Sequence, residues 1–400
     1  MSLIDTFGWS GRRDAPARAL SGLGRTCKVV RTREALEALT PAWLELEERC
    51  AGPNLFQSLG WARAIFDFEA ARGNAAFDPV IVTLREGPRL VALLPLERIH
   101  TGMRRVLAPL GHAFGQYADL LMAPDLEARG TVARMLQSAI KAAPCDVVSF
   151  HKVRKGSLLA LGMPDTAIET GTAEGAPYVA LDVYADFAGY FSTIRTKTRK
   201  NMRNARNRLA REGVVAHSVV TGRDEQFALI ERTVAGRAGR LREQGLTSRA
   251  FRDAGFADFC KKLVGRGDLE LLAFSLTHGG RPIAEQWGFV HGGRYYAFVA
   301  SRDFSNSDES PGKLHLGEIT RACFERGLAG CDLGVPAMPY KLTWATDTVA
   351  VRDHALPVTP RGWLLIQLWD VFARPRVKAG LLRIPARWRA GIMRLAGHGH

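Results

Sequence analysis

The feature that most constrains the fold is a short pattern that occurs once in each half of this 400-residue chain. Residues 84–92 read Leu-Arg-Glu-Gly-Pro-Arg-Leu-Val-Ala, and residues 276–284 read Leu-Thr-His-Gly-Gly-Arg-Pro-Ile-Ala. Both stretches are typical of a β-hairpin, because apolar residues flank a turn that contains glycine, and an arginine follows the glycine. Since unrelated hairpins share these traits, the order of the surrounding elements must decide whether the pattern is a repeat.

The predicted elements around the two hairpins follow a similar order. The first half is predicted to contain a strand, two helices, a pair of strands, a helix and a strand: 27–30, 33–48, 58–71, 79–84 with 90–99, 126–141 and 146–150. The second half is predicted to contain a strand, a long helix, a strand, two helices, three strands, a helix and a strand: 178–181, 187–211, 214–220, 224–236, 248–265, 269–276, 282–290, 295–301, 312–326 and 331–333. This mixture predicts an α/β fold of two tandem domains, in which mixed sheets are flanked by helices.

The length of the chain fits two domains better than one. We expect an N-terminal domain over 27–175 and a C-terminal domain over 176–358, preceded by a flexible basic arm over 1–26 and followed by basic amphipathic helices over 359–400. No run of about 18 uncharged apolar residues occurs, which argues against a spanning helix, and the N-terminus lacks the apolar core of a secretory signal. The six cysteines are scattered without a CxxC spacing, so we expect reduced thiols in a cytoplasmic protein and no metal site.

The two hairpins differ in polarity directly after their shared alanine. The first continues Leu93-Leu94-Pro95, and the second continues Glu285-Gln286-Trp287. Polar groups inside a sheet cost free energy unless a partner or a function retains them, so we interpret the first half as scaffold and the second as the working half. Because alternate residues of a strand share a face, Glu285 lies among apolar neighbours, an environment that suits a general base. A structural salt bridge with an arginine is the alternative.

Two further motifs follow in the second half. Ser310, Gly312 and Lys313 lie at a predicted helix start, where free backbone N–H groups favour phosphate, although a plain Pro/Gly helix start is equally compatible with them. Asp332 and Gly334 end a strand at the edge of the sheet where α/β folds place ligands, and the stretch Tyr340-Lys341-Leu342-Thr343-Trp344 follows. A tyrosine there could protonate a leaving thiolate and a lysine could hold a phosphate or carboxylate; an aromatic anchor and a solvated cation are the alternatives.

Positive charge concentrates in two stretches of a chain whose formal net charge is +15. The helix predicted over 187–211 carries eight basic residues between 195 and 211 with no acidic residue among them, and its apolar residues follow a helical stripe. The charge predicts an anionic partner, such as CoA phosphates, nucleic acid or a membrane, or else only a solvated face; no aromatic residues are interleaved on the basic stretch for base stacking. The tail over 361–400 mixes arginines with tryptophans and leucines, which is typical of a segment that lies on an anionic membrane or of a helix packed on the body.

Taken together, these motifs resemble those of the CelD/BcsL-like GNAT acetyltransferases, a family associated with cellulose and exopolysaccharide biosynthesis. The resemblance is strongest over 178–355 and rests on Phe191-Ser192, Arg199-Lys200-Asn201, residues 280–284, Ser310-Pro311-Gly312 and Asp332-Leu333-Gly334 with Tyr340-Lys341. The build is similar to that of the FemABX peptidyltransferases, which also fuse two GNAT-like domains. The resemblance implies an N-acyltransferase that moves an acyl group from acyl-CoA (acetyl-CoA) to the amine of a small molecule or saccharide, without a covalent enzyme intermediate. The cysteines and the basic tail lead us to expect a cytoplasmic protein, peripheral at the inner membrane.

The expected site residues fall into three groups. The catalytic group is Glu285, Tyr340 and Asp332; the cofactor-binding group is Ser310, Gly312 and Lys313; the substrate-binding group is Arg199, Lys200, Asn201, Lys341 and Trp344, and no metal is expected. Two other functions stay open on the sequence alone. One is a FemABX-type transferase that uses aminoacyl-tRNA, and the other is a membrane-associated accessory protein without catalytic activity.

Overall fold

The computed structural model describes residues 24–50, 55–102, 104–246, 248–303, 311–385 and 388–389. Most of the expected basic arm and the end of the C-terminal tail therefore lie outside the described residues, as does Ser310.

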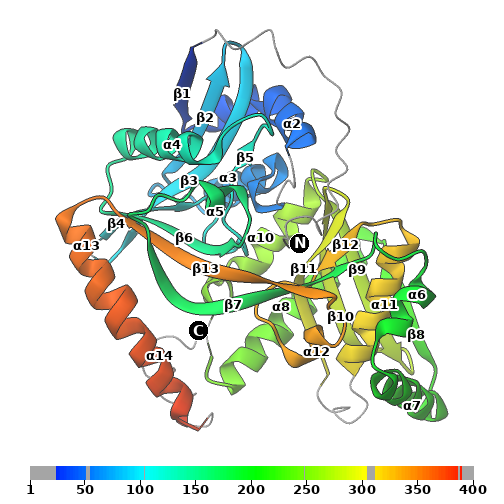
Figure 1. Ribbon diagram of the computed structural model, residues 1–400. Coiled ribbons are helices and arrows are strands. Elements are labelled where there is room, and N and C mark those ends of the chain that lie inside the picture. The colour runs from blue at the N-terminus through cyan, green and yellow to red at the C-terminus, as the bar shows by residue number, and fades with distance from the viewer. Residues whose placement is uncertain are drawn as a thin grey trace.

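The described strands form one sheet that runs through both halves of the chain (Figure 1). In spatial order they are β1 (Arg25–Val30), β2 (Pro79–Glu86), β3 (Arg89–Thr101), β4 (Arg104–Pro109), β6 (Val147–Arg154), β13 (Asp347–Pro357), β7 (Ile168–Ala180), β12 (Gly330–Asp332), β11 (Arg294–Arg302), β10 (Arg281–His291), β9 (Glu270–His278) and β8 (Val215–Val220), with β5 (Leu121–Met122) paired to β3. Most neighbours are antiparallel, but β4 with β6 and β11 with β12 are parallel, so the sheet is mixed as expected.

The strands of each half follow the same order from an outer edge of the sheet to its middle, where the two sets meet. The last strand of each half lies beside the other half's strands, because β7 pairs with β12 and β13 pairs with β6. These two strands also pair with one another along most of their length (Figure 1). The boundary expected between residues 175 and 176 lies within β7.

The two hairpins have equivalent registers. Leu84 pairs with Ala92 across β2 and β3, and Leu276 pairs with Ala284 across β9 and β10. Gly87 has a φ of 59° and Gly279 a φ of 56°, a left-handed conformation that glycine adopts without the penalty of a Cβ atom. The repeat predicted from the two sequence stretches is confirmed.

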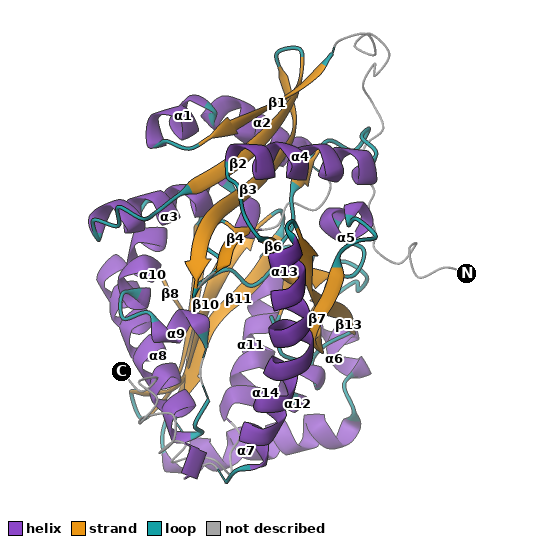
Figure 2. Ribbon diagram, turned by 90° about the vertical axis from the view of Figure 1, so that its left-hand side faces the viewer, coloured by secondary structure: helices purple, strands orange, loops and turns teal. Residues whose placement is uncertain are grey.

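Helices flank the sheet on both faces (Figure 2). They are α1 (Arg33–Ala38), α2 (Thr40–Arg49), η2 (Leu55–Gln57), α3 (Leu59–Ala71), α4 (Ala128–Ala142), α5 (Leu158–Gly162), α6 (Phe187–Thr193), α7 (Thr196–Glu212), α8 (Arg223–Glu243), α9 (Arg249–Arg252), α10 (Phe256–Gly265), α11 (Pro311–Glu325), α12 (Pro339–Leu342), α13 (Pro360–Leu365), η4 (Ile366–Ala373) and α14 (Arg374–Arg383). None of the described helices combines the length and the apolar composition needed to cross a bilayer.

Three helices predicted as continuous are interrupted. The helix expected over 33–48 is divided into α1 and α2 at Leu39. The single helix expected over 187–211 is wrong, because Ile194 and Arg195 have extended ψ values of 133° and 131° and separate α6 from α7. Ile194 is buried at this break, in the core with Tyr190. The helix expected over 248–265 is likewise broken between α9 and α10, where the Asp253 carboxylate accepts a hydrogen bond from the Gly255 N–H at 2.9 Å and closes a local turn.

One aromatic core joins the two halves. Helix α3 of the first half packs on α10 of the second. The rings of Phe114 and Phe259 stack with centroids 4.4 Å apart, and Trp61 meets Phe259 edge-on at 5.3 Å. Such offset and edge-on pairs contribute about 0.5–1.5 kcal/mol each beyond the area they bury. The halves therefore form a single packed unit.

Candidate active site

The candidate residues gather near the edge at which β11 and β12 part. These strands pair at only three positions, Arg294–Tyr296 with Gly330–Asp332. β11 then continues to Arg302, whereas the chain leaves β12 through Gly334, which has a φ of 70°. This left-handed conformation favours glycine, and a Cβ atom here would lie 2.6 Å from Oε1 of Gln116, so that this side chain would have to move. Polar residues at the carboxyl ends of such strands are where α/β folds bind ligands.

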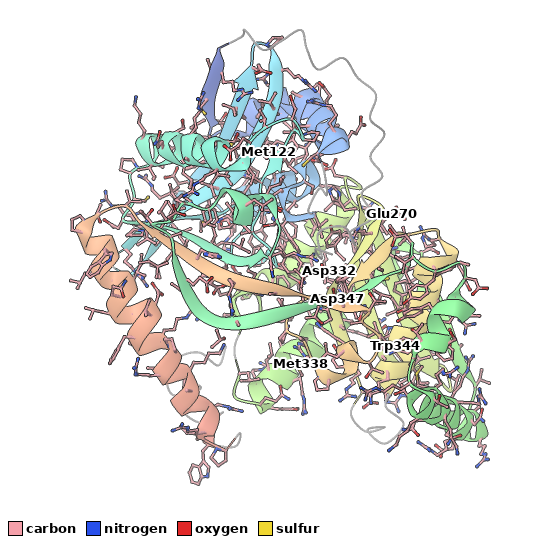
Figure 3. All side chains as sticks on the ribbon, in the orientation of Figure 1. Met122, Glu270, Asp332, Met338, Trp344 and Asp347 are labelled. Atoms are coloured by element: carbon pink, nitrogen blue, oxygen red, sulfur yellow. The ribbon has the colours of Figure 1, made fainter. Side chains whose placement is uncertain are left out.

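Asp332 anchors this edge through a buried ion pair between the two halves. Its Oδ2 accepts a hydrogen bond from Arg154, and its Oδ1 accepts bonds of 2.8 Å from the Tyr117 hydroxyl and from the Gly334 N–H. Asp332 is 6% exposed. Its backbone pairs with Tyr178 of β7, and Asp347 of β13 pairs with Tyr178 from the opposite side of that strand (Figure 3). A carboxylate that already accepts three hydrogen bonds fixes its donors in place.

Lys341 lies directly beyond this anchor, on α12. Its Nζ donates a hydrogen bond of 2.8 Å to the carbonyl oxygen of Gly334. Burial lowers the pKa of Lys341 to about 8, with Arg237 and Lys152 acting in the same direction and Asp332 opposing them. An amine with this pKa can hold or release a proton near neutral pH.

Tyr340 precedes Lys341 on the same helix. Burial raises the pKa of Tyr340, while the positive charges of Arg237 and Arg302 act in the opposite direction. Arg237 of α8 is thus close enough to influence both residues of α12. A phenol whose pKa is raised stays protonated at neutral pH and is able to donate a hydrogen bond or a proton.

Glu285 is buried on β10, as expected, but it is not alone. The guanidinium of Arg232 on α8 donates two hydrogen bonds to it, of 2.7 Å and 3.2 Å. Trp287, two residues along, faces the same helix and donates from Nε1 to the Thr233 hydroxyl at 2.9 Å. The carboxylate is 6% exposed, and both of its oxygens are engaged by one guanidinium. In this conformation Glu285 makes the salt bridge that was the alternative to a role as base.

The expected cofactor-binding residues Gly312 and Lys313 lie in the first turn of α11. The helix begins Pro311-Gly312-Lys313, and its first turn contains no acidic residue. Lys313 is exposed. The N–H groups of a helix start favour phosphate, and a cation beside them adds to this preference.

Comparison with known proteins identifies this part of the chain. Residues 196–342, from α7 to the last residue of α12, match the family model described as an acetyltransferase (GNAT) domain. Residues 196–342 are thus similar to a GNAT domain. No curated protein matches the chain in sequence.

Solved structures extend the likeness to both halves. The chain is similar to FemX, with a TM-score of 0.56, 11% identity and coverage of 86% of this chain and 100% of that chain. It also matches a tandem GNAT protein from the clavulanic acid biosynthesis pathway, with a TM-score of 0.47, 12% identity and coverage of 84% and 99%. At these identities a likeness shows the fold alone, and the FemX match carries it. The fold is a mixed α/β fold of two tandem GNAT-like units, as predicted.

The substrate-binding candidates of the GNAT domain are dispersed. Lys200 and Asn201 are exposed on α7, and Arg199 donates to the Thr196 hydroxyl at 3.3 Å. Trp344 is fully buried, and its backbone carbonyl accepts a hydrogen bond from the Tyr190 hydroxyl (Figure 3). A Cβ atom at Gly317 of α11 would lie 2.4 Å from the Trp344 ring, so this tryptophan packs directly against the helix backbone. Only Lys341 of this group joins Tyr340 and Asp332 near Gly334.

Three residues of this region were missed by the sequence reasoning. Arg154 and Tyr117 reach Asp332 from the first half, and Arg237 reaches α12 from α8. Arg237 belongs to a run of arginines on α8 whose members look alike in sequence. No local signal singles out Arg154 or Tyr117, because their role depends on strands of the two halves meeting. Among the described residues, no group of three or more His, Cys, Asp or Glu side chains is arranged to hold a metal ion.

Proposed function

We propose that the GNAT domain transfers an acyl group from acyl-CoA, such as acetyl-CoA, to the amine of a saccharide or small molecule in polysaccharide or cell-envelope synthesis. The observation that carries this proposal is that Tyr340 and Lys341, whose pKa values shift in opposite directions, lie on one short helix where β11 and β12 part. Helix α11, which contacts α12, begins without an acidic side chain and suits the diphosphate of CoA.

The reaction needs a proton donor and a proton acceptor. The amine nitrogen forms a bond to the thioester carbonyl carbon, the carbon–sulfur bond breaks, and the thiolate leaves. In our proposal the Tyr340 hydroxyl gives its proton to the thiolate, because burial keeps the phenol protonated near neutral pH. The Gly312 and Lys313 N–H groups and the Lys313 ammonium hold the phosphates of the donor.

We assign the proton acceptor to Lys341. Its amine has a pKa of about 8, so a fraction is neutral at physiological pH and is able to take the proton that the acceptor nitrogen loses. Glu285 is the other candidate, directly or through a water molecule. Arg232 already donates to both of its oxygens and so competes with a proton for the same lone pairs. Asp332 then acts as a positioning residue, through the Gly334 N–H and carbonyl.

Binding and rate measurements test the proposal. Isothermal titration should show that CoA thioesters bind the full-length protein, and amine-dependent thiol release should follow. Lys341→Met should lower kcat at pH 7, whereas Glu285→Gln should retain most of it; the reverse result would assign the base to Glu285. Binding of charged tRNA in a gel shift without any binding of CoA would replace this proposal with aminoacyl-tRNA-dependent transfer.

We further propose that the C-terminal helix rests on an anionic membrane. Helices α13, η4 and α14 bury Ile366 against the body and pair Asp370 with Arg104 at 2.8 Å (Figure 2). Their outer face is apolar and between 49% and 58% exposed at five positions: Trp363, Leu364, Leu368, Trp369 and Phe372. The exposed basic residues Arg376 and Arg383 follow this face, and no acidic residue lies on it. An exposed apolar face with flanking arginines is complementary to lipid chains beneath anionic headgroups.

Vesicle sedimentation tests this surface. The protein should bind vesicles that contain phosphatidylglycerol and not vesicles of phosphatidylcholine alone, and Leu368→Glu with Phe372→Glu should abolish binding. Leu161→Glu, at a leucine 64% exposed on α5, is the matched control and should leave binding intact. A dimer that dissociates on the same double substitution would show that a second copy of the chain covers this face instead.

A further inference from the structure

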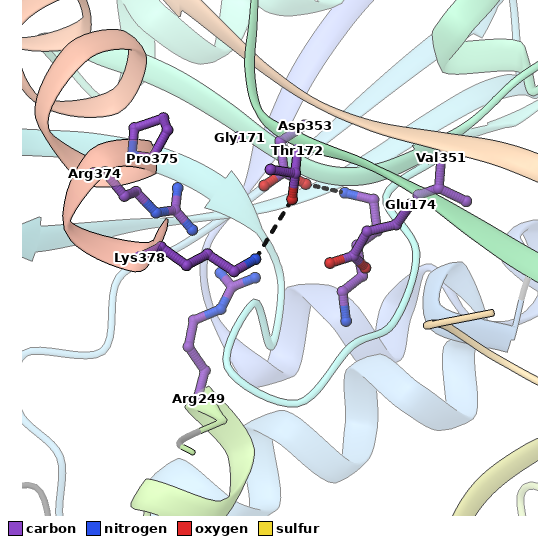
Figure 4. A pocket seen from close by; sticks show the side chains of 10 residues that line it. Gly171, Thr172, Glu174, Arg249, Val351, Asp353, Arg374, Pro375 and Lys378 are labelled. Atoms are coloured by element: carbon purple, nitrogen blue, oxygen red, sulfur yellow. Dashed lines mark hydrogen bonds between the residues drawn. The ribbon is translucent and has the colours of Figure 1, made fainter. Parts of the chain in front are cut away.

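A second set of cations lines a hollow between the central strands and the helices α9 and α14. The hollow has a volume of about 610 Å³, including space open to solvent. It is bounded by β6, β7, β13, α9 and α14 (Figure 4). Six charged side chains line it, four of them cationic: Lys152, Arg249, Arg374 and Lys378, with Glu174 and Asp353.

Irregular strand pairing shapes this hollow. His151 and Lys152 of β6 both lie opposite Asp353 of β13, so β6 carries one extra residue there. Lys152 has a φ of 57°, and it is the only residue other than glycine with a positive φ in the described parts of the chain. The neighbouring strand β7 is also irregular at Gly171, which has a φ of 74°. Bulges of this kind redirect side chains and are frequent beside functional sites.

The two acids of the hollow offset only part of the charge of its four cations. Lys152, Arg249 and Arg374 make no ion pair or side-chain hydrogen bond with the described residues, and Lys378 makes a bond of 3.4 Å to the Thr172 hydroxyl. Burial lowers the pKa of Lys152 and of Arg249. The charge of Arg249 adds to the effect on Lys152, and the charges of Arg374 and Arg252 add to the effect on Arg249, while Asp353 opposes both shifts. Unpaired cations that are partly desolvated cost free energy unless an anion completes the site.

The one well-placed acid of the hollow is already engaged. Asp353 accepts a hydrogen bond of 2.9 Å from the Lys152 N–H and lies 3.2 Å from Nδ1 of His151. Burial alone would raise its pKa, but these donors, together with the charge of Arg374, hold the pKa of Asp353 at about 2. Asp353 therefore serves to fix the bulge, and the four cations still exceed the two acids.

We propose that this hollow binds a phosphate or diphosphate group carried by the acceptor of the transfer reaction. Two arginines and two lysines converge from three elements, and guanidinium groups match the oxygens of phosphate in a bidentate manner. Lys152 lies close enough to Lys341 to influence it, which links the hollow to α12. The acceptor is then an amine that also bears a phosphate; this part of the inference depends on the proposed acyl transfer, whereas the anion site itself does not.

Calorimetry with inorganic pyrophosphate and no acyl donor tests the site. The full-length protein should bind pyrophosphate, and Arg249→Met should weaken binding at least about tenfold, because it removes a charge-assisted hydrogen-bond donor. Arg203→Met, at an exposed arginine of α7, removes the same charge elsewhere and should change the affinity less than about twofold. Equal affinities in the wild type, Arg249→Met and Arg203→Met would overturn the proposal.

Two further readouts separate this site from a structural role and from the CoA site. Without ligand, Arg249→Met should melt at the same temperature as the wild type or above it, since it removes an unpaired cation, and it should lose the stabilisation by pyrophosphate. A melting temperature that falls while pyrophosphate still stabilises the variant would contradict a binding role. Gly312→Glu should leave pyrophosphate binding intact. If this variant loses pyrophosphate binding, the anion binds at the start of α11 and not in the hollow. If CoA does not bind in calorimetry while pyrophosphate binds as described, the proposed acyl donor is wrong and the anion site stands.

Vesicles distinguish the source of the phosphate. If the phosphate belongs to a lipid, vesicles with phosphatidic acid should bind the wild type more tightly than phosphatidylglycerol vesicles of equal charge, and pyrophosphate should compete. Arg249→Met should then remove the preference. If the phosphate belongs to a soluble acceptor, Arg249→Met should lose pyrophosphate binding with no change on either vesicle. Each result supports the site and identifies the kind of molecule that fills it.

Discussion

The two halves of this molecule share an order of strands and helices but differ at the helix that follows their third and fourth strands. In the first half, the side chain of Glu127 accepts hydrogen bonds of 2.6 Å from the N–H groups of Arg129 and Gly130 at the start of α4. These backbone donors lower the pKa of Glu127, as expected for a carboxylate at a helix start. In the second half, α11 begins with Pro311, Gly312 and Lys313 and has no acid in its first turn. The first half thus supplies its own anion at the helix start, whereas the described first turn of α11 supplies none.

The sheet interior shows the same contrast. Leu93 and Leu94 are buried after the first hairpin without any polar partner to satisfy. At the equivalent register, Glu285 is paired with Arg232, and Gln286 donates to the Tyr295 hydroxyl at 3.4 Å. The hairpin of the first half is packed with apolar side chains, and the hairpin of the second half keeps polar groups that a binding site needs. Because β7 pairs with a strand of the second half and β13 with a strand of the first, residues of the first half contact the second half.

The largest effect should come from Tyr340, which lies on α12, the helix between the last two strands of the second half. Tyr340→Phe should lower kcat by about 10²- to 10⁴-fold, the range for loss of a general acid. CoA binding measured by calorimetry should stay close to the wild type, because the ring is kept. Helix α5, which occupies the equivalent place in the first half, contains no tyrosine. Full turnover in the variant would remove the proposed proton donor and leave the fold assignment intact.

The contribution of the first half should appear in stability. Arg154→Met leaves the buried Asp332 without its cation and should lower the free energy of unfolding by about 3–5 kcal/mol, measured by urea denaturation. The control is Arg129→Met, whose partner Asp165 is 82% exposed, so that this change should cost less than about 1 kcal/mol. Equal losses in the two variants would mean that the Arg154 pair is not the link between the halves.

The two helix starts allow a reciprocal test. Gly312→Glu gives α11 an acid like that of α4 and should weaken CoA binding by about 10- to 100-fold, because the carboxylate repels the diphosphate and occupies its donors. Glu127→Gln should leave CoA affinity unchanged and lower the melting temperature only slightly, since the amide oxygen still caps the helix. Calorimetry and thermal melting measure both. A loss of CoA affinity in Glu127→Gln would place the donor in the first half.

The contrast between hairpins could be predicted from sequence, but the contacts between the halves could not. The alternation of apolar residues, the turn glycines and the Asp-x-Gly ending are local, and the structure has all of them in the expected elements. Arg154 meets Asp332 only because β7 and β13 are exchanged in the middle of the sheet, and nothing within either stretch encodes that pairing. The partner of Glu285 was likewise hidden, since any of the many arginines could have supplied it. The break at Ile194 was missed because helical periodicity continues across it.

The smallest effect, a pH dependence, sharpens the contrast at α12, where the working half holds a buried amine. The pKa of Lys341 is about 8 in the folded protein and near 10.4 in an unfolded chain. Between these values the unfolded state binds more protons than the folded state, so the stability contributed by this residue rises with pH from about 8 to about 10 and is flat below 8. Above pH 8 the melting temperature of the wild type should therefore rise relative to that of Lys341→Met. Parallel curves over this range would mean that the amine titrates as it does in water, and they would remove Lys341 as a proton acceptor near neutral pH.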